Sequence, residues 1–344
     1  MVCTFCMPWV VEVARQHKIP LVVLWIQSAA ALVTYYHYFH GHDEIIAPHI
    51  TDPAYEVSLP GLNPLRIRDM PTFFVAKMHN VQHEMFLKGF RDFIEQMDQD
   101  KPLVMVNTFD ALEHRAIEAM KPYMDVAIGP AVTLLGANGA AEDGKNYEGW
   151  LDTQPKKSVV YVSFGSLVTY TKQQVEEILH GLHKCGRPFL WVVRKEGRTE
   201  DVDSFLGNIK GGNGMIVEWC NQLQVLSHPS IGSFVTHCGW NSILEALVSG
   251  LPMVAVPNWS DQPLSACLVE KEWGVGIRAE CNTEGVLTSA ELVKSVELLM
   301  GNSEKATKIK ENTSNLKQRA QEAIATDGLS ERNLRIFFER VQHV

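Results

Sequence analysis

The sequence lacks any cluster of basic residues. Lysine and arginine together number 31, against 40 aspartates and glutamates, and the formal net charge is −9. An acidic chain without a basic segment is a poor ligand for nucleic acid and for anionic lipid. We therefore expect small molecules, and not nucleic acids or membranes, as its partners.

Cysteine is scarce and irregularly spaced. The seven cysteines in 344 residues form an odd, scattered set instead of a disulfide framework. This favours a reducing compartment, and we expect a cytoplasmic protein. Cys3 and Cys6 form a C-x-x-C pair of the kind used in redox and zinc sites. No second pair follows, so core positions are the favoured interpretation.

The sequence also lacks a convincing membrane segment and two common catalytic signatures. Residues 19–36 carry no formal charge, but Pro20 and Gln27 interrupt them, which favours a buried strand over 20–26 and a helix after it. No G-x-S-x-G elbow of a hydrolase occurs, and Gly274-Val275-Gly276 is too short for a dinucleotide fingerprint.

What the second half does contain is a regular alternation of short apolar runs and helical patterns. Strands are predicted over 158–164, 188–194, 214–219, 231–237, 252–257 and 274–279. Helices are predicted over 172–185, 240–249, 262–272, 289–300 and 303–325. Fully apolar strands between helices are typical of a parallel sheet covered on both faces. We expect an α/β, doubly wound domain over residues 149–328.

The first half repeats this alternation less completely. Its predicted strands cover 20–26, 101–107 and 126–128, and its helices cover 8–17, 28–40, 80–98 and 110–121. A doubly wound sheet usually has more strands, so the first domain, 1–130, is expected to lack its N-terminal strands. Residues 131–148 are interpreted as a linker.

The last segment, 329–344, is predicted to be an amphipathic helix that packs back on the first domain. Its apolar residues fall on one face at helical spacing. They are Leu334, Phe337, Phe338 and Val341.

Residues 219–262 hold the densest group of chemically informative side chains. At their centre a predicted strand ends at His237, Gly239 permits a tight turn, and a helix begins. A helix N-terminus is an anion site, and the carboxyl end of such a strand is where doubly wound sheets bind ligands. Asn241 and Ser242 can cap the helix or donate to a phosphate oxygen, and both interpretations stay open. Taken alone, His237 is better explained as a structural histidine.

Four further residues of this segment suit a nucleotide sugar. Glu245 lies one helical turn after Asn241, where it could bind ribose hydroxyls or be a solvated glutamate. Trp219 could stack on a base or belong to the core. Asp261 and Gln262 could accept from and donate to sugar hydroxyls, or cap a helix.

Together these features resemble the signature box of the plant family-1, UDP-sugar-dependent glycosyltransferases. The box runs from 219 to 262 without a gap, with Trp219 first, H-C-G-W-N-S in the centre and Asp261-Gln262 last. The resemblance implies a GT-B-like fold of two doubly wound, Rossmann-type domains. The second domain would bind the donor, and the first would bind most of the acceptor.

The resemblance covers essentially the whole chain. Residues 150–152 and 158–166 look like the start of the family's second domain, and 106–113 like the end of its first. Segments 8–9, 24–27 and 35–39 are similar to the subgroup of anthocyanin 5-O-glucosyltransferases and related enzymes for carboxylic acids and hormones.

The family's activity follows from this resemblance as an expectation. It implies an inverting, UDP-glucose-dependent glucosyltransferase. The acceptor would be a hydroxyl or carboxyl of a flavonoid or anthocyanin, a hormone or a terpenoid acid. UDP-glucose would be a co-substrate, with no cofactor and no metal, and we expect a monomer.

The resemblance also assigns roles to residues by position. The donor-binding set comprises Trp219 and Cys220 for uracil, Gln222 and Glu245 for ribose, His237, Asn241, Ser242 and Ser166 for the diphosphate, and Trp240, Asp261 and Gln262 for the sugar. The acceptor pocket would be lined by Trp9, Ile26, Gln27 and Trp259. A terminal Gln262 goes with glucose as the donor sugar.

The sequence departs from the family at its start. Members open with a G-x-x-G-H-like loop whose histidine takes the acceptor proton, and that histidine would lie upstream of Met1. Thr4 stands where an aspartate usually orients it. A positioned base contributes about 10²–10⁴-fold, so we expect this truncated chain to lack its catalytic base.

Three alternatives stay open beside this hypothesis. The chain could be a non-catalytic, UDP-sugar-binding remnant of such an enzyme. A nicotinamide-dependent oxidoreductase shares the fold type but lacks its glycine fingerprint. His37, His40 and His42 form an H-x-x-H-x-H group, for which solvated surface positions are favoured over a metal site.

Overall fold

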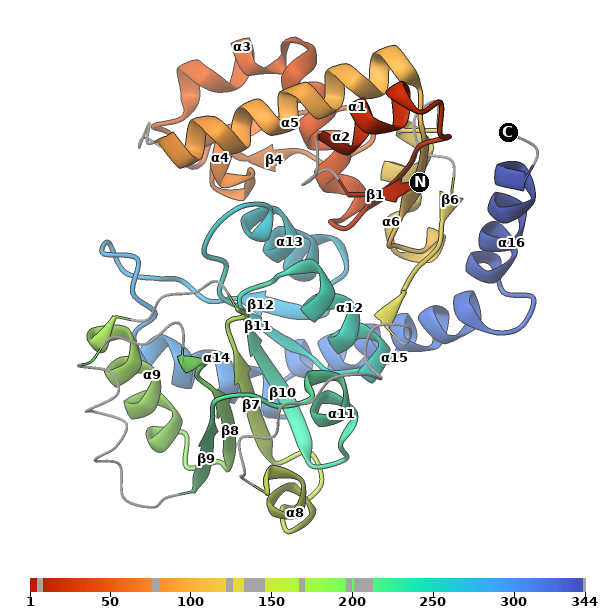
Figure 1. Cartoon of the computed structure of the whole chain (residues 1–344). Helices are drawn as coiled ribbons and strands as arrows, with labels where there is room; N and C mark the ends of the chain where they lie inside the picture. The colour runs from red at the N-terminus through yellow and green to blue at the C-terminus, as the bar shows by residue number, and fades with distance from the viewer. Residues whose placement is uncertain are drawn as a thin grey trace. The chain divides into compact units, whose positions relative to one another are not determined.

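The chain folds into two compact units, shown in the computed structural model of Figure 1. The structure describes residues 1–4, 9–75, 81–121, 126–132, 146–166, 171–195, 200 and 213–342. Unit 1 comprises Met1–Ala131, Trp259–Leu264 and Arg319–Val344, and unit 2 comprises Val132–Asn258 and Ser265–Gln318. Cys6 and most of the predicted linker lie outside the described residues.

Two segments expected in the second domain, 259–264 and 319–328, belong to unit 1 in the structure. For the first, the reason is a pair of hydrogen bonds between Ser260 and Thr72. Thr72 N donates to Ser260 O (2.9 Å), and Ser260 N donates to Thr72 Oγ1 (2.8 Å). The second begins within helix α15 (Glu304–Ile324), whose residues up to Gln318 belong to unit 2.

Unit 2 is built on a sheet of six parallel strands in the order β12-β11-β10-β7-β8-β9. The strands are β7 (Val159–Ser163), β8 (Phe189–Val192), β9 (Gly214–Val217), β10 (Ile231–Thr236), β11 (Met253–Ala255) and β12 (Gly276–Arg278). Each lies inside the apolar run that predicted it, so the parallel, doubly wound sheet is confirmed.

The described helices of unit 2 include α8 (Tyr147–Asp152), α9 (Lys172–Lys184), α11 (Gln222–Ser227), α12 (Trp240–Ser249), α14 (Ser289–Met300) and most of α15, with α13 (Gln262–Cys267) shared between the units. Helices α12 and α14 have the predicted bounds, whereas the sequence pattern did not predict the short helices α8 and α11.

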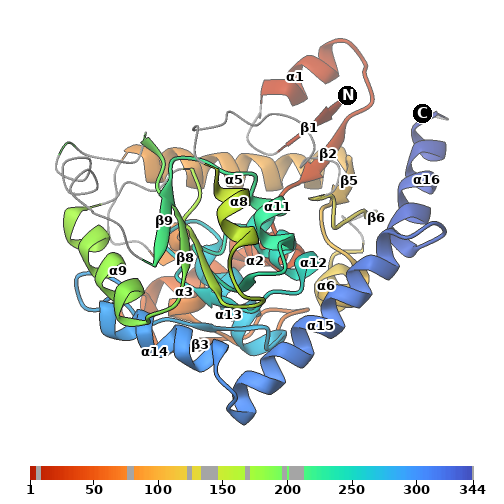
Figure 2. The ribbon, with the colours of Figure 1, turned by 90° about the horizontal axis from the view of Figure 1, so that it is seen from below.

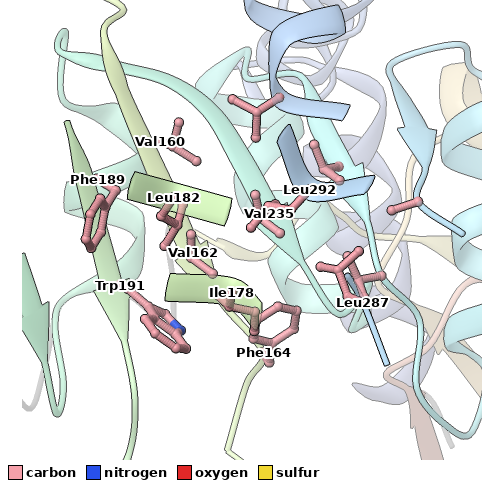
Figure 3. Close-up of a cluster of buried hydrophobic side chains, with 14 of the residues drawn as sticks. Val160, Val162, Phe164, Ile178, Leu182, Phe189, Trp191, Val235, Leu287 and Leu292 are labelled. Atoms are coloured by element: carbon pink, nitrogen blue, oxygen red, sulfur yellow. The ribbon is translucent and has the colours of Figure 1, made fainter. Parts of the chain in front are cut away.

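One face of the sheet forms an apolar core with α9 and α14 (Figure 3). Val160 and Val162 of β7 pack in the same buried cluster as Leu182 of α9 and Leu292 of α14. Because side chains alternate along a strand, Tyr161 points to the opposite face. That face carries the polar groups described below.

The centre of the sheet is a topological switch point. Strands β7 and β10 are neighbours, but the chain continues from β7 to β8 and β9 on one side and from β10 to β11 and β12 on the other. The connections therefore diverge at the carboxyl ends of β7 and β10. In open α/β sheets this divergence creates the crevice that binds ligands.

Unit 1 contains a smaller parallel sheet in the order β1-β2-β5-β6. Its strands are β1 (Val2–Cys3), β2 (Val22–Trp25), β5 (Leu103–Val106) and β6 (Val126–Ala127). Its helices include α1 (Trp9–Gln16), α2 (Ala29–His37), α3 (Asp43–Ile46), α4 (Thr72–Val75), α5 (Val81–Asp100) and α6 (Asp110–Ala119). A short antiparallel pair, β3 (Glu56–Val57) and β4 (Leu65–Arg66), was not predicted.

Helix α2 ends earlier than predicted. The pattern indicated a helix over 28–40, but α2 ends at His37 and the chain kinks within Tyr38–His42. Gly41 in this segment has a φ of +94°, a conformation that glycine adopts at little cost and that a regular α-helix excludes.

The C-terminal helix α16 (Leu329–Gln342) lies against β6 in both views (Figures 1 and 2). Ser330 Oγ donates to Gly129 O (2.6 Å), and Phe337 packs in a buried cluster with Val22 and Met105. Phe338, predicted on the same face, is instead 58% exposed. It lies about 100° around the helix from Phe337, outside the strip that faces the sheet.

No helix among the described residues combines the length and the apolar character that crossing a bilayer requires.

The start of helix α2 is held by a buried carboxylate. Glu113 of α6 accepts hydrogen bonds from the backbone N–H groups of Ala29 and Ala30, both at 2.9 Å. Ser28 Oγ accepts from Ala31 N (3.0 Å). Burial raises the pKa of Glu113, while Thr108 and the two backbone bonds act in the opposite direction. The first turn of α2 thus has side-chain acceptors from two parts of the chain.

Replacing Glu113 with alanine should lower the free energy of unfolding by about 2–4 kcal/mol, because two buried backbone N–H groups lose their acceptor. The measurement is urea unfolding followed by circular dichroism. Glu118→Ala, on the exposed side of the same helix, should stay close to the unmodified protein. Equal effects of the two substitutions would contradict the capping role.

Candidate functional site

His237 follows β10 at the switch point and lies between two glycines. A methyl group on Gly165 would come within 2.6 Å of His237 Nε2, and one on Gly239 within 2.5 Å. Gly165 also has a φ of +78°, which disfavours any other residue there. The intervening Cys238 has a φ of +67°. This left-handed backbone reverses the chain between β10 and α12.

The imidazole of His237 is uncharged at neutral pH. Burial lowers its pKa to about 4, and the backbone of Ser163 acts in the opposite direction. Within the described part of the chain, His237 Nδ1 is buried without a hydrogen-bond partner. A structural histidine would normally have both ring nitrogens satisfied, so this observation favours the ligand-binding interpretation.

Helix α12 begins beside this histidine without a side-chain cap. Its N-cap residue is Gly239, and no side chain accepts a hydrogen bond there. Asn241 is exposed, and Ser242 Oγ accepts from a glutamine. Neither residue caps the helix. The first turn of α12 therefore has the features of an anion site, with backbone N–H groups and the positive end of the helix dipole.

Gln222 and Glu245, the two residues expected to hold the ribose, belong to one hydrogen-bond network. The Nε2 of Gln222 donates to Glu245 Oε2 (2.5 Å) and to Ser242 Oγ (2.9 Å), and its Oε1 accepts from the Tyr161 hydroxyl (3.1 Å). Burial raises the pKa of Glu245, and the bond from Gln222 opposes this. The structure thus brings Gln222 and Glu245 together, with a carboxylate ready to accept hydroxyl groups.

Tyr161 is a member of this network that the sequence analysis missed. Its hydroxyl lies 3.3 Å from Cys220 Sγ as well as 3.1 Å from Gln222. The sequence signal for this role was a tyrosine in a mostly aliphatic strand. Because β7 is fully buried, a tyrosine in it needs a polar partner.

Three other residues expected to bind the nucleotide sugar are Trp219, Ser166 and Trp240. Trp219 is half-buried just after β9, and Ser166 is exposed just after β7. The indole of Trp240 is buried, with its ring centroid 6.1 Å from that of Trp273. The side chain of Trp240 is therefore a core group.

Asp261 and Gln262, the expected sugar residues, lie in unit 1. Asp261 is 6% exposed, and its Oδ1 accepts from Gln27 Nε2 (3.0 Å). Gln262 Oε1 accepts from Trp259 N (3.1 Å), which closes the loop between them. Ser260 in this loop has a φ of +62°.

Of the residues expected to line the acceptor pocket, Trp9 differs from the other three. Gln27 and Ile26 follow β2 directly. Trp259 lies edge-on to Phe73, with ring centroids 5.8 Å apart. By contrast, Trp9 is 66% exposed at the start of α1. Thr4, at the carboxyl end of β1, lines a small cavity in unit 1 with Met97.

In the histidine group at 37–42, the ring of His40 has other hydrogen-bond partners. His40 Nδ1 lies 2.7 Å from Tyr36 O, and its Nε2 lies 3.0 Å from Asp98 Oδ2. Across the described ranges no cluster of three or more metal-ligating side chains occurs. The six described cysteines are free thiols.

Comparison with known proteins identifies the family. Residues 76–320 match the family model described as UDP-glucoronosyl and UDP-glucosyl transferase. The chain belongs to the UDP-dependent glycosyltransferase family.

Plant glucosyltransferases are among its relatives. The chloroplastic crocetin glucosyltransferase of Gardenia jasminoides is 41% identical, over 98% of this chain and 75% of that protein. The anthocyanidin 3-O-glucoside 5-O-glucosyltransferase 1 of Perilla frutescens is 42% identical, over 97% of this chain and 75% of that protein.

Solved structures of similar proteins confirm the fold. Os79 from O. sativa in complex with UDP has a TM-score of 0.83 at 28% identity, covering 99% of this chain and 77% of that chain. Phytolacca americana UGT2 with UDP-2fluoro-glucose and pterostilbene has a TM-score of 0.82 at 26% identity, covering 99% and 76%. The expected GT-B fold of this glycosyltransferase is thereby confirmed.

The titration of His237 gives a prediction about stability and pH. The unfolded chain takes up the proton near pH 6.5, but the folded chain does so only near pH 4. The free energy of unfolding should therefore fall as the pH drops through this range. His237→Gln removes this titration, so the difference between the two proteins should change by about 3 kcal/mol across it.

Urea unfolding at intervals between pH 7 and pH 4 measures this difference. His180→Gln, at an exposed position of α9 in the same unit, is the matched control and should follow the unmodified protein. A constant difference between the His237→Gln variant and the unmodified protein would show that His237 titrates normally.

Proposed function

We propose that this glycosyltransferase transfers glucose from UDP-glucose, with inversion, to a hydroxyl or carboxyl group of a small plant metabolite. The observation that carries the proposal is the polar network of Tyr161, Gln222, Ser242 and Glu245 beside the uncapped start of α12 and the uncharged His237. A ribose needs acceptors for its hydroxyls, and a diphosphate needs donors. Unit 2 has both the acceptors and the donors near the carboxyl ends of β7 and β10.

The donor groups also suit the chemistry of the leaving group. As the acceptor oxygen bonds to the anomeric carbon, the bond from that carbon to the diphosphate breaks, and UDP leaves with the electron pair. Negative charge then grows on the diphosphate. The N–H groups of α12 and the His237 ring can stabilise that charge without a metal ion.

Glucose is the proposed sugar because of Asp261 and Gln262. A buried carboxylate and an amide side by side can accept from and donate to neighbouring hydroxyls. The names of several relatives specify glucosyl transfer, among them crocetin, anthocyanidin 3-O-glucoside and phloretin glucosyltransferases. These names support an apolar or phenolic acceptor. The free thiols support a reducing compartment such as the cytoplasm, and we propose that the enzyme acts there as a monomer.

A second candidate function is binding of a UDP-sugar without transfer. It is favoured by Thr4, which stands at the carboxyl end of β1 in place of a carboxylate. A hydroxyl at this position cannot stabilise a protonated base by charge. Mass spectrometry of mixtures of the chain, UDP-glucose and phenolic acceptors distinguishes the two functions, because only the transferase forms a glucoside.

Gln262→Ala should weaken binding of UDP-glucose and leave binding of UDP almost unchanged. UDP lacks the sugar that Gln262 is proposed to hold, and loss of one such hydrogen bond costs about 0.5–1.5 kcal/mol. UDP-galactose should bind more weakly than UDP-glucose to the unmodified protein. Calorimetric titration with the three ligands measures these differences. Equal weakening for UDP and UDP-glucose would contradict the assignment.

His237→Ala should weaken UDP and UDP-glucose alike, by about 1.5–3 kcal/mol, because a hydrogen bond to an ionised diphosphate is lost. The same titration measures this. Unchanged affinities with a lower melting temperature would instead show that His237 is structural.

A further inference from the structure

The side-chain amide of Gln27 is buried against the loop that carries Asp261. It is 8% exposed, and its Nε2 lies 3.0 Å from Asp261 Oδ1 and 3.4 Å from Ser260 Oγ. Because a carboxylate only accepts hydrogen bonds, the amide must turn its NH₂ group toward Asp261. Gln27 thus acts as a donor to a nearly buried carboxylate within unit 1.

The backbone that carries Gln27 is held on its C-terminal side. Ser28 is the N-cap of α2, and its carbonyl accepts from Trp25 Nε1 (2.8 Å). Glu113 binds the next two backbone N–H groups, as described above. With its neighbours fixed in this way, Gln27 has few ways to move away from Asp261.

The loop on the other side of this contact is equally constrained. Ser260 forms two hydrogen bonds with Thr72, one with its backbone N–H and one with its side-chain hydroxyl, described above. The fully buried Tyr35 hydroxyl lies beside the same groups, and burial together with the charge of Asp261 raises its pKa, while Ser260 and Gln27 act in the opposite direction. The carboxylate of Asp261 is therefore surrounded by positioned polar groups.

We propose that Gln27 is a positioning residue for the donor sugar, which fixes the carboxylate of Asp261 in the orientation that accepts glucose hydroxyls. This inference rests on the proposed function, since it takes Asp261 as a sugar ligand. It replaces the expected role of Gln27 in the acceptor pocket. The distinction matters because a carboxylate that loses a buried donor either rotates or takes up a proton.

The test is Gln27→Met, which keeps the length and volume of the side chain but removes its donor. Calorimetry should show about a tenfold weaker affinity for UDP-glucose and an unchanged affinity for UDP, because one hydrogen bond to a charged group no longer orients Asp261. Gln16→Met is the matched control. Gln16 also donates to a carboxylate, Glu12 Oε1 at 3.0 Å, but on the exposed surface of α1.

A double-mutant cycle with Asp261→Ala separates positioning from general structural support. If Gln27 acts through Asp261, the double variant should bind UDP-glucose no more weakly than Asp261→Ala alone. Additive losses in the cycle, or an unchanged UDP-glucose affinity in Gln27→Met, would overturn the inference. Gln27→Ala gives the same comparison if the methionine variant does not fold.

The experiment also distinguishes failure of the inference from failure of the proposed function. If Asp261→Ala leaves the affinity for UDP-glucose unchanged relative to UDP, Asp261 is not a sugar ligand and both are overturned. If Asp261→Ala weakens UDP-glucose selectively but Gln27→Met does not, only the role of Gln27 is wrong.

Discussion

The pairing of β7 with β10 is the constraint on which the proposed nucleotide site depends. Ser163 lies opposite Thr236 in this parallel register, so the two strands end at the same height and the turns after them face each other. Gly165 and His237 come into contact for this reason alone. A shift of one residue would turn Tyr161 to the other face of the sheet and separate it from Gln222.

The same pairing keeps the polar side chains of unit 2 on the face of the sheet opposite its apolar core. One face of β7 is closed by α9 and α14, and all the buried polar groups of the network lie on the other. There Tyr161, Gln222, Ser242 and Glu245 are joined by hydrogen bonds to one another. We infer that a ribose would find its acceptors already oriented, which reduces the ordering cost of binding.

The main polar feature of unit 1 is the almost buried carboxylate of Asp261. Asp261 is distant in sequence from Gln27, yet both belong to one compact unit. Thr72 forms hydrogen bonds with the loop that carries Asp261, and Glu113 forms hydrogen bonds with the first turn of the helix that follows Gln27. An alternating pattern of strands and helices contains no information about such a contact, because each partner lies in a loop or at a helix end.

Local patterns along the chain were enough to predict the parallel sheets, the bounds of α12 and α14, and the residues proposed for the donor site. These follow from local periodicity and from a motif that is contiguous along the chain. Local patterns did not show that 259–264 belongs to unit 1, that Tyr161 hydrogen-bonds Gln222, that the Trp240 ring is core, or that Gln27 contacts Asp261. Each of these depends on side chains far apart in sequence. Their proximity is set by strand register and packing, which local patterns do not encode.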